Sequence, residues 1–212
     1  MFKKIVMFAV TAAAGIMLLT GCSPKETPTQ VVEKVNTISI FEDYDSLKDN
    51  LTDDVVWKDE QGKKHDKDDI KAMSKFLKFF EKDDLTFLEF AKLTQDKNVQ
   101  KALDFNDADI EENEEIIANW DNIPAEEKES MNSVIKQMAK VFREGSKKVK
   151  KSFKVIKEEV NGDTATVTAK YTDFNPDEKT GELKEDGKIE IVYTLKKIDN
   201  TWKISKVVES KK

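Results

Sequence analysis

Strict alternation of apolar and polar residues near the C-terminus constrains the fold of this 212-residue chain more than any other feature. Between residues 164 and 172, alanine, valine and tyrosine alternate with threonine and lysine. A period of two residues is typical of a β-strand with one buried face. Residues 189–195 repeat the pattern with isoleucine, tyrosine and leucine. The stretch 153–208 therefore predicts several consecutive strands, with Tyr171 and Tyr193 on their inward faces.

The same stretch contains the turns that join the predicted strands. Asn161-Gly162 is a strong hairpin signal between a first strand at 153–160 and the strand that begins at Thr164. Asp199-Asn200 predicts a second tight turn. Residues 175–187 contain proline and glycine among polar residues and predict a polar loop. The strands are therefore expected to follow one another as hairpins.

The first residues of the chain have the pattern of an export signal. Two lysines precede an apolar stretch at residues 5–19, which is too short to span a bilayer comfortably, and Leu-Thr-Gly-Cys follows at residues 19–22. This arrangement resembles a bacterial lipoprotein signal peptide. The resemblance implies cleavage before Cys22, a diacylglycerol thioether on its sulfur, and an amino terminus acylated with a chain such as palmitate. An ordinary secretory signal, in which Cys22 is incidental, is the alternative.

The predicted organisation follows from this signal. Residues 1–21 form the signal peptide, residues 22–30 the lipidated cysteine and a flexible tether, and residues 31–208 a single α+β domain. Two or more acyl chains anchor a protein stably, since each buried methylene contributes about 0.8 kcal/mol. We therefore expect a location in the bacterial cell envelope, on the extracytoplasmic face of the inner membrane or at an outer membrane where the host has one.

Composition excludes several classes of function. Cys22 is the only cysteine, so the mature chain has no thiol for a disulfide, a metal site or a nucleophile. Loss of residues 1–21, which contain two lysines and no acidic residue, changes the formal net charge from −6 to −8. An acidic protein with Arg143 as its only arginine is poorly suited to phosphate recognition. No nucleic-acid partner and no cofactor are expected.

Upstream of the strands, the periodicity becomes helical. Residues 31–51 carry an apolar stripe with a break at 43–45, and residues 54–58 predict a short strand that ends in a turn with Gly62. Asp66, with Asp69 three residues later, predicts the start of a further helix.

Two segments carry a resemblance to a known family: LTDDVVWKDEQGKKHDKDDIKAM from residue 51, and GKIEIVYTLKKIDNTWKISKV from residue 187. Together with the order of elements, they resemble the nuclear transport factor 2-like superfamily, also called SnoaL-like or cystatin-like. The resemblance covers residues 32–82 and 153–208. It implies an α+β fold in which a curved antiparallel sheet wraps around N-terminal helices as a cone and encloses a pocket.

Residues 83–152 are a helical insertion before the C-terminal strands, longer than the family's usual connection. Its clearest helix opens at Asn122 and Pro124 and is expected to stop at Gly145. A basic run at 147–151 then predicts a solvated edge. The insertion is expected either to cover the open end of the sheet or to carry a surface for a partner.

The sequence offers little for catalysis. His65 is the only histidine and lies among charged residues, which favours a solvated loop position over a pocket-mouth group paired with Asp66. Enzymes of the resembled family, such as ketosteroid isomerase, use an inward aspartate with a tyrosine. Here Asp54 and Asp59 are expected to be exposed at the ends of the first strand, and Glu190 to point outward. We therefore predict no catalytic residues and no enzymatic activity.

Two clusters have a structural and a functional interpretation. The acidic segment 104–115 lacks the glycine of a helix-loop-helix calcium site, so a solvated helix N-terminus is favoured and no metal is expected. Five phenylalanines lie within fifteen residues, and a packed core is favoured over a ligand cavity. The five are Phe76, Phe79, Phe80, Phe87 and Phe90.

The predicted function is a non-catalytic binding module for an apolar or amphipathic small molecule, held between the curved sheet and the helices. An envelope protein–protein interaction module that uses the insertion is the alternative, and a small cone-fold enzyme comes third. The membrane, through the lipid anchor, is the further expected partner. The predicted pocket wall is Trp57, Phe76, Phe80, Tyr171, Tyr193 and Trp202.

Overall fold

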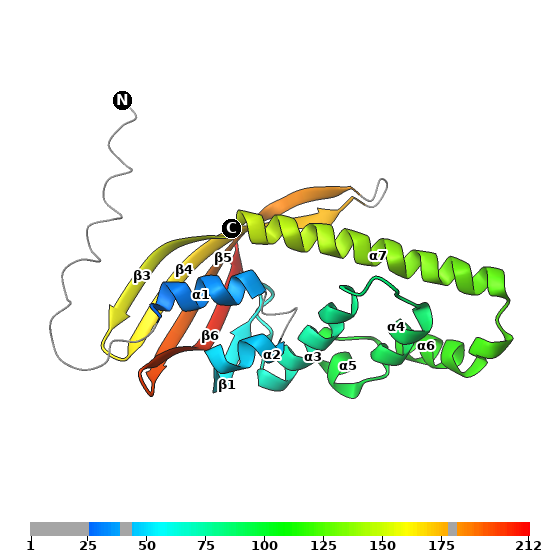
Figure 1. The fold of residues 1–212 in the computed structure, drawn as a ribbon, viewed down its shortest axis with the longest axis horizontal. Coiled ribbons are helices and arrows are strands. Elements are labelled where there is room, and N and C mark those ends of the chain that lie inside the picture. Colours follow the sequence, from blue (N-terminus) through cyan, green and yellow to red (C-terminus); the bar gives the residue numbers. More distant parts are fainter. Residues whose placement is uncertain (1–25, 39–43, 178–181) are drawn as a thin grey trace, which may run out of the picture.

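The computed structural model describes residues 26–38, 44–177 and 182–212, so the predicted signal peptide and Cys22 lie outside the described residues. The described part contains seven α-helices and one six-stranded sheet (Figure 1). The helices are α1 (Pro28–Ile38), α2 (Tyr44–Leu47), α3 (Lys67–Phe79), α4 (Phe87–Thr94), α5 (Lys97–Leu103), α6 (Asp107–Asn119) and α7 (Ala125–Ser152). The strands are β1 (Leu51–Lys58), β2 (Lys64–His65), β3 (Lys154–Asn161), β4 (Thr164–Pro176), β5 (Leu183–Ile198) and β6 (Thr201–Lys211). Two short 3₁₀ helices, η1 (Lys48–Asn50) and η2 (Trp120–Asn122), precede β1 and α7.

The sheet has the order β2-β1-β6-β5-β4-β3 and is curved (Figure 1). Every neighbouring pair is antiparallel except β1 and β6, which run parallel. Helix α1 lies across one face and packs on β3, β4 and β6. The helices α3 to α6 gather beyond the sheet, and α7 runs from them back to β4 (Figure 1). The predicted α+β fold class is confirmed, with the parallel β1–β6 pair as an addition to the expected antiparallel sheet.

The two predicted tight turns are present, with the first shifted by one residue. β3 and β4 are joined by Gly162 and Asp163, and Gly162 has φ of 60°. Glycine at the first central position is the requirement of a type II′ turn. Asp199 and Asn200 have φ of 47° and 61°, as a type I′ turn requires. Both turns match the right-handed twist of the strands they connect.

The predicted polar loop at 175–187 is wrong for most of its length. β4 continues to Pro176 and β5 begins at Leu183, with Pro176 paired to Leu183 and Phe174 to Glu185. This part of the hairpin extends beyond the main core, so polar residues are tolerated on its exposed side. Leu183 contacts α7, and that contact gives the extension an apolar support that the local sequence did not indicate.

The N-terminal helix differs from the prediction at both ends. It begins at Pro28, inside the predicted tether, because Thr27 and Gln30 form a capping box. The Gln30 amide donates to Thr27 Oγ1 at 3.2 Å, and the Thr27 amide donates to Gln30 Oε1 at 2.8 Å. The helical stretch predicted up to residue 51 ends earlier, since Leu51 is already the first residue of β1. The capping box predicted for α3 is confirmed, with Asp66 accepting from the Asp69 amide at 2.9 Å.

The predicted stop of α7 at Gly145 is wrong, because the helix continues to Ser152. Gly145 does not adopt the left-handed conformation of a helix stop and packs beside Leu183 instead. The end of α7 is held to the sheet by Ser152, whose Oγ accepts a hydrogen bond from the Thr172 amide at 2.9 Å. The basic run 147–151 therefore forms the last turns of a helix.

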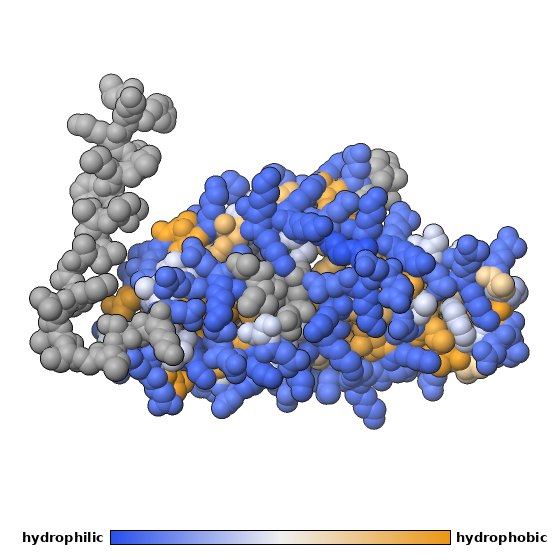
Figure 2. Space-filling view, in the orientation of Figure 1, coloured by the Kyte–Doolittle hydropathy of each residue, from blue (hydrophilic) through white to orange (hydrophobic). Residues whose placement is uncertain are grey.

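The core has two main parts. The first lies between the sheet and α1 and includes Val32, Val167, Leu195 and Ile204, none of which is exposed. The second is the phenylalanine core between α3, α4 and α7, where the rings of Phe76 and Phe80 lie 5.2 Å apart and those of Phe80 and Phe142 lie 5.5 Å apart. The interpretation as packed core is confirmed for Phe76, Phe79, Phe80 and Phe90. Phe87 lies at the edge of this core, with its ring 5.9 Å from that of Phe90. The outer surface in Figure 2 is largely hydrophilic, with separate hydrophobic patches.

Leu195 tests the first core. Leu195→Ala should lower the free energy of unfolding by about 2 to 5 kcal/mol, because a fully buried side chain leaves a cavity. Ile198→Ala, at an exposed position of the same strand, should cost less than about 1 kcal/mol. Urea denaturation of both variants measures the difference. Equal losses would contradict the core described above.

Candidate functional site

A two-lobed cavity opens between the curved sheet and the end of α7. Its lobes have volumes of 210 and 250 Å³, and four residues line both lobes. The shared residues are Trp57, Tyr171, Asp173 and Glu209. The inner lobe also contacts Tyr193 and the α7 residues Ser146 and Val149. We call this two-lobed space the Glu209 cavity.

Glu209 reaches the cavity because β6 contains an irregularity. Leu195 pairs with Ile204 and Thr194 with Lys206, so Ser205 is an extra residue in β6. An extra residue re-aims the side chains that follow it. Ile204 is inward before the shift, and Val207 and Glu209 are inward after it. Sequence reasoning missed Glu209, because the extra residue Ser205 shifts the alternation that Trp202 and Ile204 begin, and nothing in the local pattern marks that shift.

Glu209 is a carboxyl group held in a poorly solvated position. The Tyr171 hydroxyl donates a hydrogen bond to Glu209 Oε1 at 3.2 Å. Burial raises the pKa of Glu209 to about 7, the nearby acids Glu60, Asp59 and Asp173 add to this rise, and the Tyr171 hydrogen bond opposes it. Burial also raises the pKa of Tyr171, so its phenol stays protonated as a donor.

The position of His65 overturns its prediction as a solvated histidine. β2 pairs with β1 so that His65 lies opposite Trp57, and only 2% of His65 is exposed. Its ring stacks on Trp57 at 4.8 Å between centroids. His65 Nε2 lies 3.0 Å from Asp59 Oδ2. A two-residue strand after a polar turn gave no sequence signal for this burial.

Asp59 is also not exposed as predicted, because it lies between His65 and the turn. Burial alone would raise the pKa of Asp59, but hydrogen bonds from His65 and from the Lys63 amide lower it below its usual range. The Lys63 amide donates to Asp59 Oδ1 at 2.8 Å. The His65–Asp59 pair therefore supports Trp57, on which the His65 ring stacks. Asp54 is exposed as expected and pairs with Lys196.

The structure brings together three of the six predicted wall residues. Trp57, Tyr171 and Tyr193 line the inner lobe of the Glu209 cavity. Phe76 and Phe80 lie in the phenylalanine core instead, because their helical spacing directs them toward α4 and α7. Trp202 is 5% exposed and packs within the core of the sheet.

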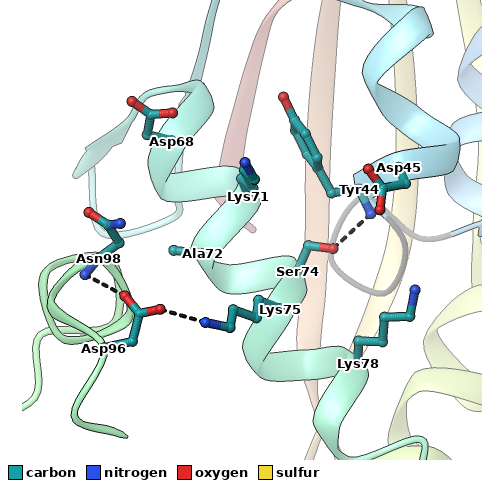
Figure 3. Close-up of a pocket in the computed structure, with 10 residues that line it drawn as sticks. All are labelled: Tyr44, Asp45, Asp68, Lys71, Ala72, Ser74, Lys75, Lys78, Asp96 and Asn98. Carbon is teal, nitrogen blue, oxygen red and sulfur yellow. Dashed lines mark hydrogen bonds and ion pairs between the residues drawn. The ribbon is translucent and has the colours of Figure 1, made fainter. Parts of the chain in front are cut away.

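A second, more polar cleft of 430 Å³ runs along α3 (Figure 3). Its charged side chains compensate one another, with three lysines and three aspartates among its lining residues. Lys75 Nζ lies 2.6 Å from Asp96 Oδ2, and Asp96 also accepts from the Asn98 amide at 2.9 Å (Figure 3). The Tyr44 amide donates to Ser74 Oγ at 2.7 Å. Since these polar groups are matched and accessible to water, the Glu209 cavity is the stronger candidate site.

Other candidate sites from the sequence receive a structural interpretation. Asp107 and Asp109 lie in the first turn of α6, which has no buried residue, so the solvated helix N-terminus is confirmed. No group of three acidic, histidine or cysteine side chains within residues 26–38, 44–177 and 182–212 is arranged to hold a metal ion. Within the same ranges, no helix has the length and apolar character needed to cross a membrane.

Comparison with known proteins does not assign this chain to a family. No protein-family model matches it, and no curated protein matches it. Among solved structures, it is similar to an NTF2-like protein of unknown function in nutrient uptake from Rhodospirillum rubrum, with a TM-score of 0.40, 10% identity, and coverage of 88% of this chain and 99% of that chain. It is also similar to an NTF2-like protein with a cystatin-like fold from Novosphingobium aromaticivorans, with a TM-score of 0.24, 14% identity, and coverage of 38% and 53%. At these scores the likenesses carry no conclusion about the function of this chain.

The raised pKa of Glu209 predicts a pH dependence of stability. The folded chain keeps this proton up to about pH 7, whereas an unperturbed glutamate releases it near 4.5. The folded state therefore binds more protons between these values, so its stability falls as pH rises through them and levels off above. Relative to Glu209→Gln, the parent chain should lose roughly 1 to 3 kcal/mol between about pH 5 and about pH 8. Urea denaturation at both pH values measures the loss.

Glu190→Gln is the matched control, because Glu190 lies on the neighbouring strand and pairs with Lys170 and Lys212 near solvent. This variant should keep the pH dependence of the parent chain. An unchanged pH dependence in Glu209→Gln would show that Glu209 does not carry it.

Proposed function

We propose that this protein is a lipid-anchored, non-catalytic binding module that holds a small amphipathic molecule in the Glu209 cavity. The main support for this proposal is the position of Glu209, a partly buried carboxyl group with Tyr171 as its hydrogen-bond donor. A poorly solvated carboxyl group gains from a ligand that pairs with it. Tyr193, Ile191 and Val207 offer apolar contact in the inner lobe, beside this polar group.

The charge of the outer lobe favours a ligand with a cationic head. Asp59, Glu60, Asp173 and Glu209 contribute four carboxyl groups to its wall, and no lysine lines it. The aromatic rings of Trp57 and Tyr171 complete the lobe. Aromatic faces and carboxylates together are the usual surroundings of an ammonium group. The ligand class is therefore a small amphiphile with an ammonium head and a short apolar body.

A homologous pair of alkyl probes tests the cavity. Hexyltrimethylammonium should bind the chain more tightly than hexanoate, and its affinity should increase about threefold to tenfold as pH rises through about 7, because the cation favours the ionised form of Glu209. Isothermal titration at both pH values measures the affinities. Glu209→Gln should remove the pH dependence, and Glu190→Gln should keep it. Equal binding of the two probes would contradict a cation-selective cavity.

The lipid anchor is the second part of the proposal. Its support is the sequence of residues 3–22, with two lysines, an apolar stretch and Leu-Thr-Gly-Cys. The acyl chains would hold the folded domain at the surface of a membrane of the bacterial envelope. Thr27, which caps α1, follows Cys22 by only five residues, and so short a connection would keep the domain close to that surface.

Cys22→Ser tests the anchor. In a bacterial host, the parent chain should take up labelled palmitate and sediment with membranes, whereas Cys22→Ser should take up no label and lose its membrane association, because the acyl chains have no attachment site. Cell fractionation with palmitate labelling measures both. Cys22→Ser leaves the apolar signal residues intact, so the label is the deciding measurement, and equal uptake of palmitate by the two chains would contradict lipidation at Cys22.

Acid–base catalysis is the second candidate, and one observation favours it. A carboxyl group with a pKa of about 7 can both donate and accept a proton near neutral pH. The hydrogen bond described for Glu209, however, comes from Tyr171, whose raised pKa keeps it a donor and unable to accept a proton. Since His65 is buried and already paired to Asp59, the binding function is the better supported of the two.

A further inference from the structure

A further hollow adjoins the Glu209 cavity along the C-terminal turns of α7, between α7 and the end of the β4–β5 hairpin. It has a volume of 600 Å³, within the range of about 300 to 1,000 Å³ of small-molecule sites. It contacts Leu77 of α3 at one side and Phe174, Pro176 and Leu183 of the hairpin at the other. No ionisable side chain lines it among the described residues. We call it the α7 groove.

One stripe of α7 forms the wall of the groove and is not covered by the described chain. Val134 and Met138 are 52% and 49% exposed, although both are large apolar residues. They are followed at helical spacing by Val141 and Gly145, which also line the groove. A neighbouring stripe, with Ile135 and Ala139, is buried in the phenylalanine core. Helix α7 is therefore apolar on two sides, and the described residues fill only one of them.

The hairpin gives the groove a second apolar wall. Phe174 and Leu183 belong to strands that run alongside α7 (Figure 1). A β-carbon built on Gly145 would lie 3.8 Å from both terminal carbons of Leu183, so the two walls touch at this point. Apolar atoms thus face each other across a hollow. This shape suits a single hydrocarbon chain held on two sides better than a flat membrane surface.

Positive charge is concentrated at the same part of α7. From residue 136 to residue 151 the helix carries seven basic residues and one acidic residue, in a chain whose formal net charge is −6. A favourable helix dipole accounts for Lys150 and Lys151 in the last turn, but its effect does not extend to the turns before. Lys148 Nζ lies 5.4 Å from the ring centroid of Phe174, at the groove wall. No described carboxylate forms an ion pair with Lys148.

We infer that the α7 groove binds a single-chain anionic amphiphile, of which a fatty acid carboxylate is the simplest case. The hydrocarbon chain lies between Met138 and Leu183, and the acidic head lies at Lys148, beside Phe174. The basic end of the groove is the argument for this occupant, because an uncharged apolar partner would gain nothing from the Lys148 ammonium group. The site is separate from the Glu209 cavity in charge and position, although Ser146 and Val149 line both.

Dodecanoate, kept below its micelle concentration, tests the groove on the full chain by isothermal titration. Met138→Glu should weaken dodecanoate binding at least about tenfold, because it places a carboxylate against the hydrocarbon chain. Met138→Leu, which keeps an apolar side chain of similar size, should leave the affinity unchanged. Since Met138 is half exposed, both variants should keep the thermal midpoint of the parent chain.

The head group is tested by charge reversal. Lys148→Glu should weaken dodecanoate binding about threefold to tenfold, and Lys206→Glu, the same charge change at an exposed position of β6, should leave it unchanged. Dodecyltrimethylammonium in the Glu209→Gln background should bind the groove more weakly than dodecanoate. Glu209→Gln alone should leave dodecanoate binding intact, which separates this site from the Glu209 cavity.

Three results would overturn the inference. The first is an equal dodecanoate affinity for the parent chain and Met138→Glu, and the second is equal binding of the anionic and cationic probes. The third is a dimer, seen by analytical ultracentrifugation, that Met138→Glu dissociates while dodecanoate does not bind. In that case the groove would be covered by a second copy of this chain.

Discussion

The parallel pairing of β1 with β6 is the contact on which the architecture of the site depends. It joins Trp57, from the first third of the chain, to Val207 near its end, and Val207 in turn pairs with Tyr193. Tyr193 pairs with Val167, so one row of side chains crosses four neighbouring strands. Cross-strand neighbours of this kind fix each other's position on the inner face. Without the β1–β6 pair, Trp57 and Glu209 would not share a cavity.

Charge is distributed unevenly around the end of α7. On the sheet side, Asp59, Glu60, Asp173 and Glu209 make the outer lobe acidic. The last turns of α7 are basic, and Lys148 lies beside Phe174 at the wall of the α7 groove. The opposite head-group charges proposed for the two hollows rest on this difference between the outer lobe and the groove wall. The long α7 lines both hollows and also connects the helical part to the sheet.

The insertion and the hairpin show why local pattern was a partial guide. The helical character of residues 83–152 and the alternation in β4 and β5 were both predicted, because helix and strand periodicity are properties of neighbouring residues. The stop at Gly145 and the loop at 175–187 were predicted wrongly for one shared reason. Gly145 lies beside Leu183, so each element has a neighbour there that its local sequence does not show.

The sequence by itself determined the α+β class, the inward faces of Tyr171 and Tyr193, and the core role of the phenylalanines, because each depends on spacing along the chain. Only the tertiary structure decided the surroundings of His65 and Glu209. His65 is buried because a two-residue strand pairs it with Trp57, and Glu209 is inward because an extra residue in β6 shifts the alternation. Both depend on partners distant in sequence, and burial by such partners, rather than residue type, sets the pKa of Glu209.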